Sequence, residues 1–396
     1  FAKNGAALAL RCWVQATDAR ANLLIARIRC EGGEPLAAEV RLEAGHENGY
    51  EAAAGSAGDI AFLDVRADAE DRIEGYETAK VRVAVGIVGA DCAGAGGGLR
   101  FTITPGRECA LVACIMSVFD ATDYREAAVA RVREIGFAEA DALEAAHRKW
   151  WRTFWSKSYV ELPNKTVEMQ FYGSLYLLAS CMRAGEWAPG LYGPWVMKNP
   201  AWGGEAPLNY NYEAPYYCTI PTNHAELAEN YEKLILDWVP NAEENARRHG
   251  FTGVYYEAYP GPLPRGSMFS ACNWTGLDDM GRDCFMNQKS NALLAASPMI
   301  LRYYYTRDAA YAAKVYEPFL KKVAAFWVDY LRWDGTRYVI ENDFVHEGPN
   351  SINPQTNPLT SLGLLRLLFQ GLIAISEDLG VDADLREVWR DRLAKL

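Results

Sequence analysis

The spacing of hydrophobic residues changes part-way along the chain. Up to about residue 125, short runs alternate apolar with polar residues or are rich in β-branched residues, and turn-forming breaks separate them. The runs are ALALRCWVQA, LLIARIRCEG, AAEVRLEAG, DIAFLDVRAD, KVRVAVGIVG, LRFTITPG and ECALVACIMSVF. The breaks include EGGEP, AGSAGD and GADCAGAGGG. Because no helical patterns lie between these short strands, the sequence predicts an antiparallel β-sandwich over residues 1–125.

From about Tyr124 onward the apolar residues recur with the period of a helix. The clearest example runs from Asn223, the predicted N-cap, through its capping-box partner Glu226 to a stop at Gly250. Its predicted buried face consists of Leu227, Tyr231, Leu234, Ile235, Trp238, Val239, Ala242 and Ala246. Similar stripes occur in VEMQFYGSLYLLASCMR, NALLAASPMILRYYY, YEPFLKKVAAFWVDYL and LTSLGLLRLLFQGLIAIS.

The connections between these helices alternate between short and long. TRDAA is short, whereas residues 184–221, 251–287 and 333–358 are long, aromatic and rich in glycine and proline. Long loops inside a compact domain usually carry function, and helical hairpins arranged in a toroid bring such loops together on one face. We therefore predict a helical linker over residues 126–165 and a toroidal domain with a cleft over residues 166–396.

The composition of the chain bears on its number of domains and on the partners that it can bind. The 396 residues are 50% hydrophobic, which allows two domains. The formal net charge of -11 argues against nucleic acid and anionic membranes, because both bind basic surfaces. No apolar run approaches the roughly 20 residues of a membrane span, so the sequence predicts a soluble protein. Nine cysteines without a CxxC pair predict buried free thiols in a reducing compartment rather than a zinc site.

The ends of the sequence leave its cellular location open. It starts at Phe1 and stops within a predicted helix, RDRLAKL, so a signal peptide or a C-terminal segment can lie outside it. We expect the cytoplasm, or the periplasm or medium if a signal peptide is removed. No cofactor or metal is expected, and the oligomeric state is open.

Aromatic residues crowd the first long loop. They are Trp187, Tyr192, Trp195, Trp202, Tyr210, Tyr212, Tyr216 and Tyr217. Because aromatic faces stack on sugar rings while amides and carboxylates pair with hydroxyl groups, the cluster predicts a carbohydrate-binding cleft. For any single ring, the core of the toroid is the alternative. The residues assigned to substrate binding are Trp195, Trp202, Glu205, Tyr212, Gln288 and His346.

Three polar residues are candidates for catalysis. Asn209 and Asn211 are two apart, so in an extended stretch their side chains share a face and can hold one water molecule; an Asx-turn pair is the alternative. Glu347 lies in ENDFVHEGPNSINPQTNP, whose prolines exclude a helix. A carboxyl group in an aromatic cleft has a raised pKa, which suits a general acid. A solvated loop glutamate is the alternative.

Several segments resemble glycoside hydrolase family 95. They are RKWWRTFWSKSYVELP, YGSLYLLASCMRAGEWAPGLYGPWV, AWGGEAPLNYNYEAPYYCTIPTNHAELAENY, and the Glu347 loop with the following LGLLRLLFQGLIAISEDLG. The resemblance covers most of residues 140–396 and implies a β-sandwich, a helical linker and an (α/α)6 barrel that is incomplete at its C-terminus here. The family includes inverting α-L-fucosidases and related α-L-galactosidases.

The resemblance also implies roles for single residues. In the family, an Asn-x-Asn pair at the positions of Asn209 and Asn211 helps an aspartate to activate the attacking water, and a glutamate at the position of Glu347 is the general acid. Inversion needs room for that water, with the two carboxyl groups roughly 6.5 to 9.5 Å apart. No metal or cofactor is implied.

The sequence departs from the family pattern at three points. The family's aspartate lies beyond Leu396, so the base is outside this sequence or is replaced; the candidates for replacement are Asp278, Asp279, Asp283 and Asp343. The usual Asp-Tyr-His before the Asn-x-Asn pair is Glu205-Ala206-Pro207, which leaves fucose specificity open. The helix after the Glu347 loop carries Ser361 where an aspartate is usual.

Two alternatives stay open. An inverting disaccharide phosphorylase or hydrolase similar to glycoside hydrolase family 65 shares the predicted architecture, although in that family the acid follows Gly-Pro, whereas Glu347 precedes it. A carbohydrate-binding protein that has lost the base would keep the cleft without turnover. The sugar, its anomer and linkage, and exo or endo cleavage are open as well.

Overall fold

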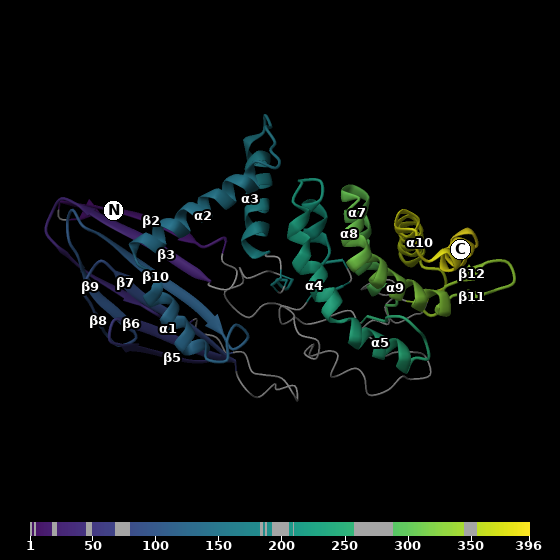
Figure 1. The fold of residues 1–396 in the computed structure, drawn as a ribbon, viewed down its shortest axis with the longest axis horizontal. Helices are drawn as coiled ribbons and strands as arrows, with labels where there is room; N and C mark the ends of the chain where they lie inside the picture. Colours follow the sequence, from purple (N-terminus) through teal and green to yellow (C-terminus); the bar gives the residue numbers. More distant parts are fainter. Residues whose placement is uncertain are drawn as a thin grey trace. The chain divides into compact units, whose positions relative to one another are not determined.

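The protein divides into two compact units, Phe1–Ser156 and Lys157–Leu396. The computed structural model describes residues 2–3, 5–17, 22–44, 50–67, 80–182, 185–186, 188–191, 206–208, 210–256, 288–343 and 355–396. Figure 1 labels most of the helices and strands of both units.

Two antiparallel sheets form most of the first unit. A seven-stranded sheet has the order β1-β2-β3-β10-β7-β6-β5, and a three-stranded sheet has the order β4-β9-β8. The strands are β1 (Ala2–Lys3), β2 (Ala6–Val14), β3 (Leu23–Glu31), β4 (Leu36–Arg41), β5 (Tyr50–Ala57), β6 (Ile60–Ala67), β7 (Lys80–Val88), β8 (Cys92–Gly94), β9 (Gly98–Ile103) and β10 (Glu108–Ser117). The predicted antiparallel sandwich is therefore confirmed.

Two of these strands run through stretches that the sequence pattern presents as breaks. β5 includes the start of AGSAGD, and β8 lies inside GADCAGAGGG. In β5 the register places Gly55 opposite Phe62 of β6. A Cβ on Gly55 would lie 2.6 Å from the Phe62 ring, so the ring covers the glycine and takes the place of its missing side chain. Cross-strand packing of this kind is invisible to a local composition pattern.

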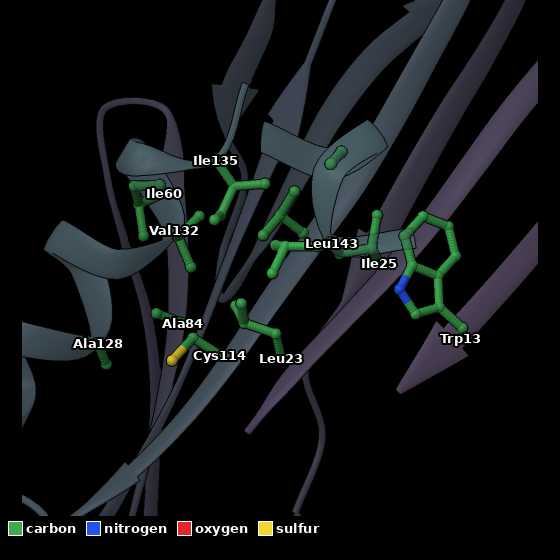
Figure 2. Close-up of a cluster of buried hydrophobic side chains, with 12 residues drawn as sticks. Trp13, Leu23, Ile25, Ile60, Ala84, Cys114, Ala128, Val132, Ile135 and Leu143 are labelled. Atoms are coloured by element: carbon green, nitrogen blue, oxygen red, sulfur yellow. The ribbon is translucent and has the colours of Figure 1, made fainter. Parts of the chain in front are cut away.

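Helices α1 (Tyr124–Glu134) and α2 (Phe137–Trp155) belong to the first unit rather than standing free of it. Their apolar residues complete the core of the large sheet, as Figure 2 shows for Ala128, Val132, Ile135 and Leu143. The strand residues of the same cluster are Trp13, Leu23, Ile25, Ile60, Ala84, Val112 and Cys114. The predicted linker boundaries at residues 126 and 165 stay predictions, but most of that segment is part of a packed core.

The second unit is helical. Its helices, among the described residues, are α3 (Lys165–Cys181), η3 (Ala214–Thr219), η4 (Ala225–Ala228), α4 (Glu229–Asp237), α5 (Val239–Arg248), α7 (Asn291–Thr306), α8 (Ala309–Tyr311), the π-helical η6 (Ala312–Tyr316), α9 (Glu317–Tyr330), α10 (Leu359–Leu379) and α11 (Ala383–Ala394). A short hairpin joins β11 (Arg332–Trp333) to β12 (Tyr338–Val339). Two-residue turns join α7 to α8 and three-residue turns join α10 to α11, so the predicted helical hairpins of a toroid-like domain are confirmed.

Helix α7 is the central helix of the described part of this unit. Its first ten residues are all buried, which is typical of a helix surrounded by protein on every side. Helix α10 packs closely against it, because Gly371 lies where a Cβ would come within 2.6 Å of Ile300. The N-terminal ends of α7 and α10 both lie beside Asp343, which accepts hydrogen bonds from the Lys289 amide before α7 and from the Ser361 hydroxyl in the first turn of α10.

The predicted helix between Asn223 and Gly250 is broken into three parts, η4, α4 and α5, with Trp238 at the junction before Pro240. The predicted capping box is wrong: the Asn223 amide donates to the Lys157 carbonyl (3.3 Å), and Glu226 pairs with the Lys157 ammonium (2.5 Å). The predicted face is buried apart from Val239, which is half-buried. The spacing of the apolar residues therefore predicts the buried face correctly, whereas the capping pattern does not predict where the helix begins.

Helix α10 bears on our prediction that no apolar run approaches the length of a membrane span. An 18-residue window within its 21 residues has a mean hydropathy of 1.6, so one described helix is long and apolar enough to cross a membrane, contrary to our prediction that no run is. The core helix of a soluble protein satisfies the same criterion, and α10 packs against α7, α9 and α11. The seven cysteines among the described residues are free thiols, of which Cys30, Cys109 and Cys114 are buried while Cys12 and Cys218 are exposed.

Candidate active site

Tyrosine side chains tie the first long loop and helix α4 to helix α7. The Tyr231 hydroxyl donates to the Ala295 carbonyl (2.7 Å), and the hydroxyl groups of Tyr217 and Ser297 are 2.8 Å apart. The ring of Tyr212 stacks on that of Tyr231 with centroids 4.9 Å apart. The loop that carries the predicted asparagine pair is thus fixed to the central helix.

Tyr212 and Asn211 have different surroundings. Tyr212 is 2% exposed and its hydroxyl donates to the Tyr231 carbonyl (3.4 Å), so its ring lies in the core, the alternative given above for a single ring. Asn211 is exposed. Both residues line a cavity of about 260 Å³ between the C-terminal half of α3 and the start of η3. The other lining residues are Ser174, Leu177, Leu178, Cys181, Met182, Pro189, Gly190, Leu191, Pro215 and Tyr216.

The backbone around Asn211 forms a turn, not the extended stretch that we predicted. Tyr210 has φ = 113°, and the Tyr212 amide donates to the Pro207 carbonyl (3.0 Å). A tyrosine in the left-handed region costs about 1–3 kcal/mol and persists only where its surroundings hold it there. The direction of the Asn211 side chain therefore depends on the backbone conformation of Tyr210 and does not follow from the two-residue spacing of the asparagines.

The side chain that holds Tyr210 belongs to Glu213, which our sequence reasoning did not include among the site residues. Its Oε2 accepts a hydrogen bond from the Tyr210 amide (2.9 Å), and the carboxyl group is fully buried at 0% exposure. Its Oε1 has no hydrogen-bond partner, and no cation pairs with it among the described residues. Burial raises the pKa of Glu213 to about 8, against the lowering effect of the nearby backbone amides. The only signal in the sequence is a lone carboxylate inside a run of tyrosines.

We expect Glu213→Gln to change how stability depends on pH. The pKa of Glu213 rises from 4.5 in the unfolded chain to about 8 in the folded protein, so folding takes up a proton between these values. The stabilisation is fully present below about pH 4.5 and is lost as the pH rises through about 8. Because glutamine does not titrate, the stability of the wild type relative to the variant should fall by at most about 1.4 kcal/mol per pH unit across this window. Urea unfolding of both proteins at about pH 5 and about pH 8 measures the effect. A difference that does not change with pH would contradict it.

A second polar cluster joins the N-terminal ends of α7 and α10. Asp343 is fully buried, its Oδ1 accepts from the Lys289 amide (2.8 Å), and its Oδ2 accepts from the Ser361 hydroxyl (2.5 Å). Both carboxylate oxygens of Asp343 thus bind donors of the protein and the side chain is shielded from solvent, which argues against its replacing the family's base. Ser361, at the position where an aspartate is usual, serves as the hydrogen-bond donor to this aspartate.

The same cluster fixes both ends of the segment that carries Glu347. Asp343 and Gln355 pair as an antiparallel bridge, with amide-to-carbonyl distances of 3.3 and 2.8 Å. Gln288, next to Lys289, is 2% exposed; its Nε2 donates to the Ser290 hydroxyl (3.0 Å), and its Oε1 has no partner among the described residues. Asp343 and Gln355, the described residues on either side of the Glu347 segment, thus lie at the N-terminal end of α7.

The remaining predicted site residues lie outside the described residues. They are Trp195, Trp202, Glu205, Asn209, His346 and Glu347, together with the candidate bases Asp278, Asp279 and Asp283. Their roles stay predictions. In the part of the chain that the structure describes, no group of three or more His, Cys, Asp or Glu side chains could hold a metal ion.

Comparison with known proteins assigns the second unit to a family. The model of the glycosyl hydrolase family 95 catalytic domain matches residues 143–396. The chain belongs to glycosyl hydrolase family 95. The resemblance that we drew from the Asn-x-Asn and Glu347 segments is confirmed at the level of the family. None of the curated proteins matches this family-95 chain.

A solved structure shares the fold of the family-95 chain along nearly its whole length. It is a putative kojibiose phosphorylase from human microbiome, with a TM-score of 0.62 and 11% sequence identity, and the match covers 99% of this chain and 54% of that chain. At this identity the match shows the common architecture of a β-sandwich followed by a helical domain. The family-95 chain spans about half the length of that phosphorylase.

Proposed function

We propose that this family-95 chain belongs to a glycoside hydrolase that removes a terminal sugar from an oligosaccharide or polysaccharide with inversion of configuration, in the manner of an α-L-fucosidase. The observation that carries the proposal is the family-95 catalytic-domain match over residues 143–396, within which Asn211 stands exposed at the rim of a cavity. The sugar itself is left to experiment, because Glu205-Ala206-Pro207 replaces the usual Asp-Tyr-His.

In the proposed mechanism Glu347 protonates the glycosidic oxygen as the bond to the anomeric carbon breaks. Asn209 and Asn211 hold a water molecule on the opposite face of the sugar ring, and a carboxylate takes its proton as it attacks. The Asp343–Gln355 bridge supports the role of Glu347, since it holds the two described residues that flank the acid's segment at the N-terminal ends of α7 and α10. We assign none of the described residues as this carboxylate base.

A second candidate is a phosphorylase, which the fold of the putative kojibiose phosphorylase favours. Such an enzyme would use inorganic phosphate in place of water. The full-length protein incubated with α-L-fucosyl, α-L-galactosyl, α-glucosyl and β-linked substrates, with and without phosphate, separates these candidates. Free sugar released at the same rate in both conditions supports hydrolysis. A sugar 1-phosphate formed only with phosphate supports the phosphorylase, and binding without turnover supports a carbohydrate-binding protein.

A further inference from the structure

Glu213 lies in an unusual environment for a carboxyl group. Other buried carboxyl groups of the second unit have several donors; Glu232, for example, accepts hydrogen bonds from Arg302, Tyr311 and Tyr316. Glu213 has one contact with a donor outside its own residue, the Tyr210 amide, and its Oε1 is unpaired among the described residues. Removing a carboxyl group from water without a cation or several donors is costly. The hydrogen bond to the Tyr210 amide is therefore the described interaction that the buried carboxyl group of Glu213 makes with another residue.

The Tyr210 peptide is the part of the turn that needs support. Its φ of 113° lies in a region that side chains other than glycine rarely adopt, and its own side chain is 59% exposed, so little packing holds it. The carbonyl of Tyr210 accepts from the Ala214 amide (2.9 Å), while its amide donates to Glu213. Both polar groups of this residue are thus bound by the segment that follows Asn211.

Tyr210 is also the residue between the two asparagines assigned to the attacking water. A rotation of its φ toward the usual negative values would swing Asn209 and Asn211 relative to each other. Misplacement of a reacting group by about 1 Å can reduce turnover about 100-fold, so the geometry of this one residue matters for a site of this kind.

We propose that Glu213 is a positioning residue that holds Tyr210 in its left-handed conformation and so fixes the direction in which Asn211 faces the cavity. This inference rests on the proposed function, because it concerns the same attacking water. Glu213 does not touch the substrate in this role, and it acts through the Tyr210 peptide.

Steady-state kinetics of Glu213→Leu and Glu213→Gln test the role. Leucine fills the site without an acceptor, so kcat should fall about 100-fold while KM changes less than about 3-fold. Glutamine keeps a carbonyl oxygen for the Tyr210 amide, so its kcat should return to within about 5-fold of the wild type. Tyr210→Gly in the Glu213→Leu background should recover part of the activity, because glycine adopts this φ without strain. Glu226→Gln, a change of the same chemistry at the ion pair with Lys157, is the control.

A glutamine variant as inactive as the leucine variant would overturn the proposal, because the carboxyl group would then have a chemical role. A folded leucine variant with full activity, or one whose loss lies in KM alone, would also overturn it.

Hydrogen exchange of the Tyr210 amide provides a test that needs neither a folded leucine variant nor a substrate. In the wild-type protein this amide should exchange at least about 100-fold more slowly than an unprotected amide, and protection should persist in Glu213→Gln. An unprotected amide would overturn the role of Glu213 even if the enzyme is active. A wild-type protein that hydrolyses no substrate while the amide stays protected would count against the proposed function and leave the hold on Tyr210 in place.

Discussion

Glu347→Gln should reduce hydrolysis of natural oligosaccharides by roughly 10³-fold, within the range of 10²–10⁴ typical for loss of a general acid. A sugar leaving group is strongly basic and needs a proton as the glycosidic bond breaks, and glutamine cannot supply it. A dinitrophenyl leaving group departs without protonation, so we expect the same variant to hydrolyse such a glycoside within about 10-fold of the wild type. The measurement is kcat/KM for both substrates.

The dependence on the leaving group distinguishes an acid from a residue that only shapes the cleft. Glu341→Gln is the matched control. Glu341 precedes Glu347 by six residues in the sequence, and it is a surface residue that pairs with Arg332 (2.6 Å). It should change neither rate by more than about 2-fold. An equal loss on both substrates for Glu347→Gln would remove the assignment of the general acid.

Arg302→Met should destabilise the second unit by about 3–5 kcal/mol, because it leaves a buried carboxylate without its cation. Glu232 is 1% exposed, and its two oxygens accept from Arg302 (2.9 and 3.0 Å), Tyr316 (3.0 Å) and Tyr311 (2.5 Å). Burial raises the pKa of Glu232, and the charge of Arg302 opposes that rise. Without the arginine the carboxyl group should take up a proton, so the deficit should be largest at neutral pH and shrink in acid.

Urea denaturation of Arg302→Met and of the double variant Glu232→Leu/Arg302→Met measures this effect. The double variant should recover much of the loss, because replacing both partners leaves no buried charge. Arg390→Met is the control, since Arg390 pairs with Glu377 and Glu387 on the surface, where ion pairs contribute little to stability. A double variant as unstable as Arg302→Met would show that packing rather than charge explains the loss.

The architecture was predictable because it depends on patterns that extend over many residues. The change from strand period to helix period near residue 125 and the alternation of short and long connections both reflect burial of one face, which a sequence displays directly. Strand β5 was not predictable, since Gly55 is covered by Phe62 from the neighbouring strand. The capping box at Asn223 failed because Lys157, 66 residues away, binds both of its members.

The candidate site was predictable where it follows a motif and unpredictable where it depends on folding. The asparagine pair and the Glu347 segment could be found from their residue types and from the family resemblance. The turn at Tyr210 and the burial of Glu213 could not, because the carboxyl group loses its water only once Tyr212 and Tyr231 pack around the turn. Asp343 was named as a possible base from its residue type alone, and its two hydrogen-bonded oxygens indicate a structural role.

Proton NMR of the sugar released in the first minutes of turnover by the full-length wild-type protein tests whether hydrolysis inverts the anomeric configuration. We expect the anomer opposite to that of the substrate to appear first and then to mutarotate, because one water molecule held by the asparagine pair attacks the face away from the leaving group. A first product that retains the anomeric configuration would rule out the proposed inverting mechanism, since retention requires a nucleophilic carboxylate where we place the water.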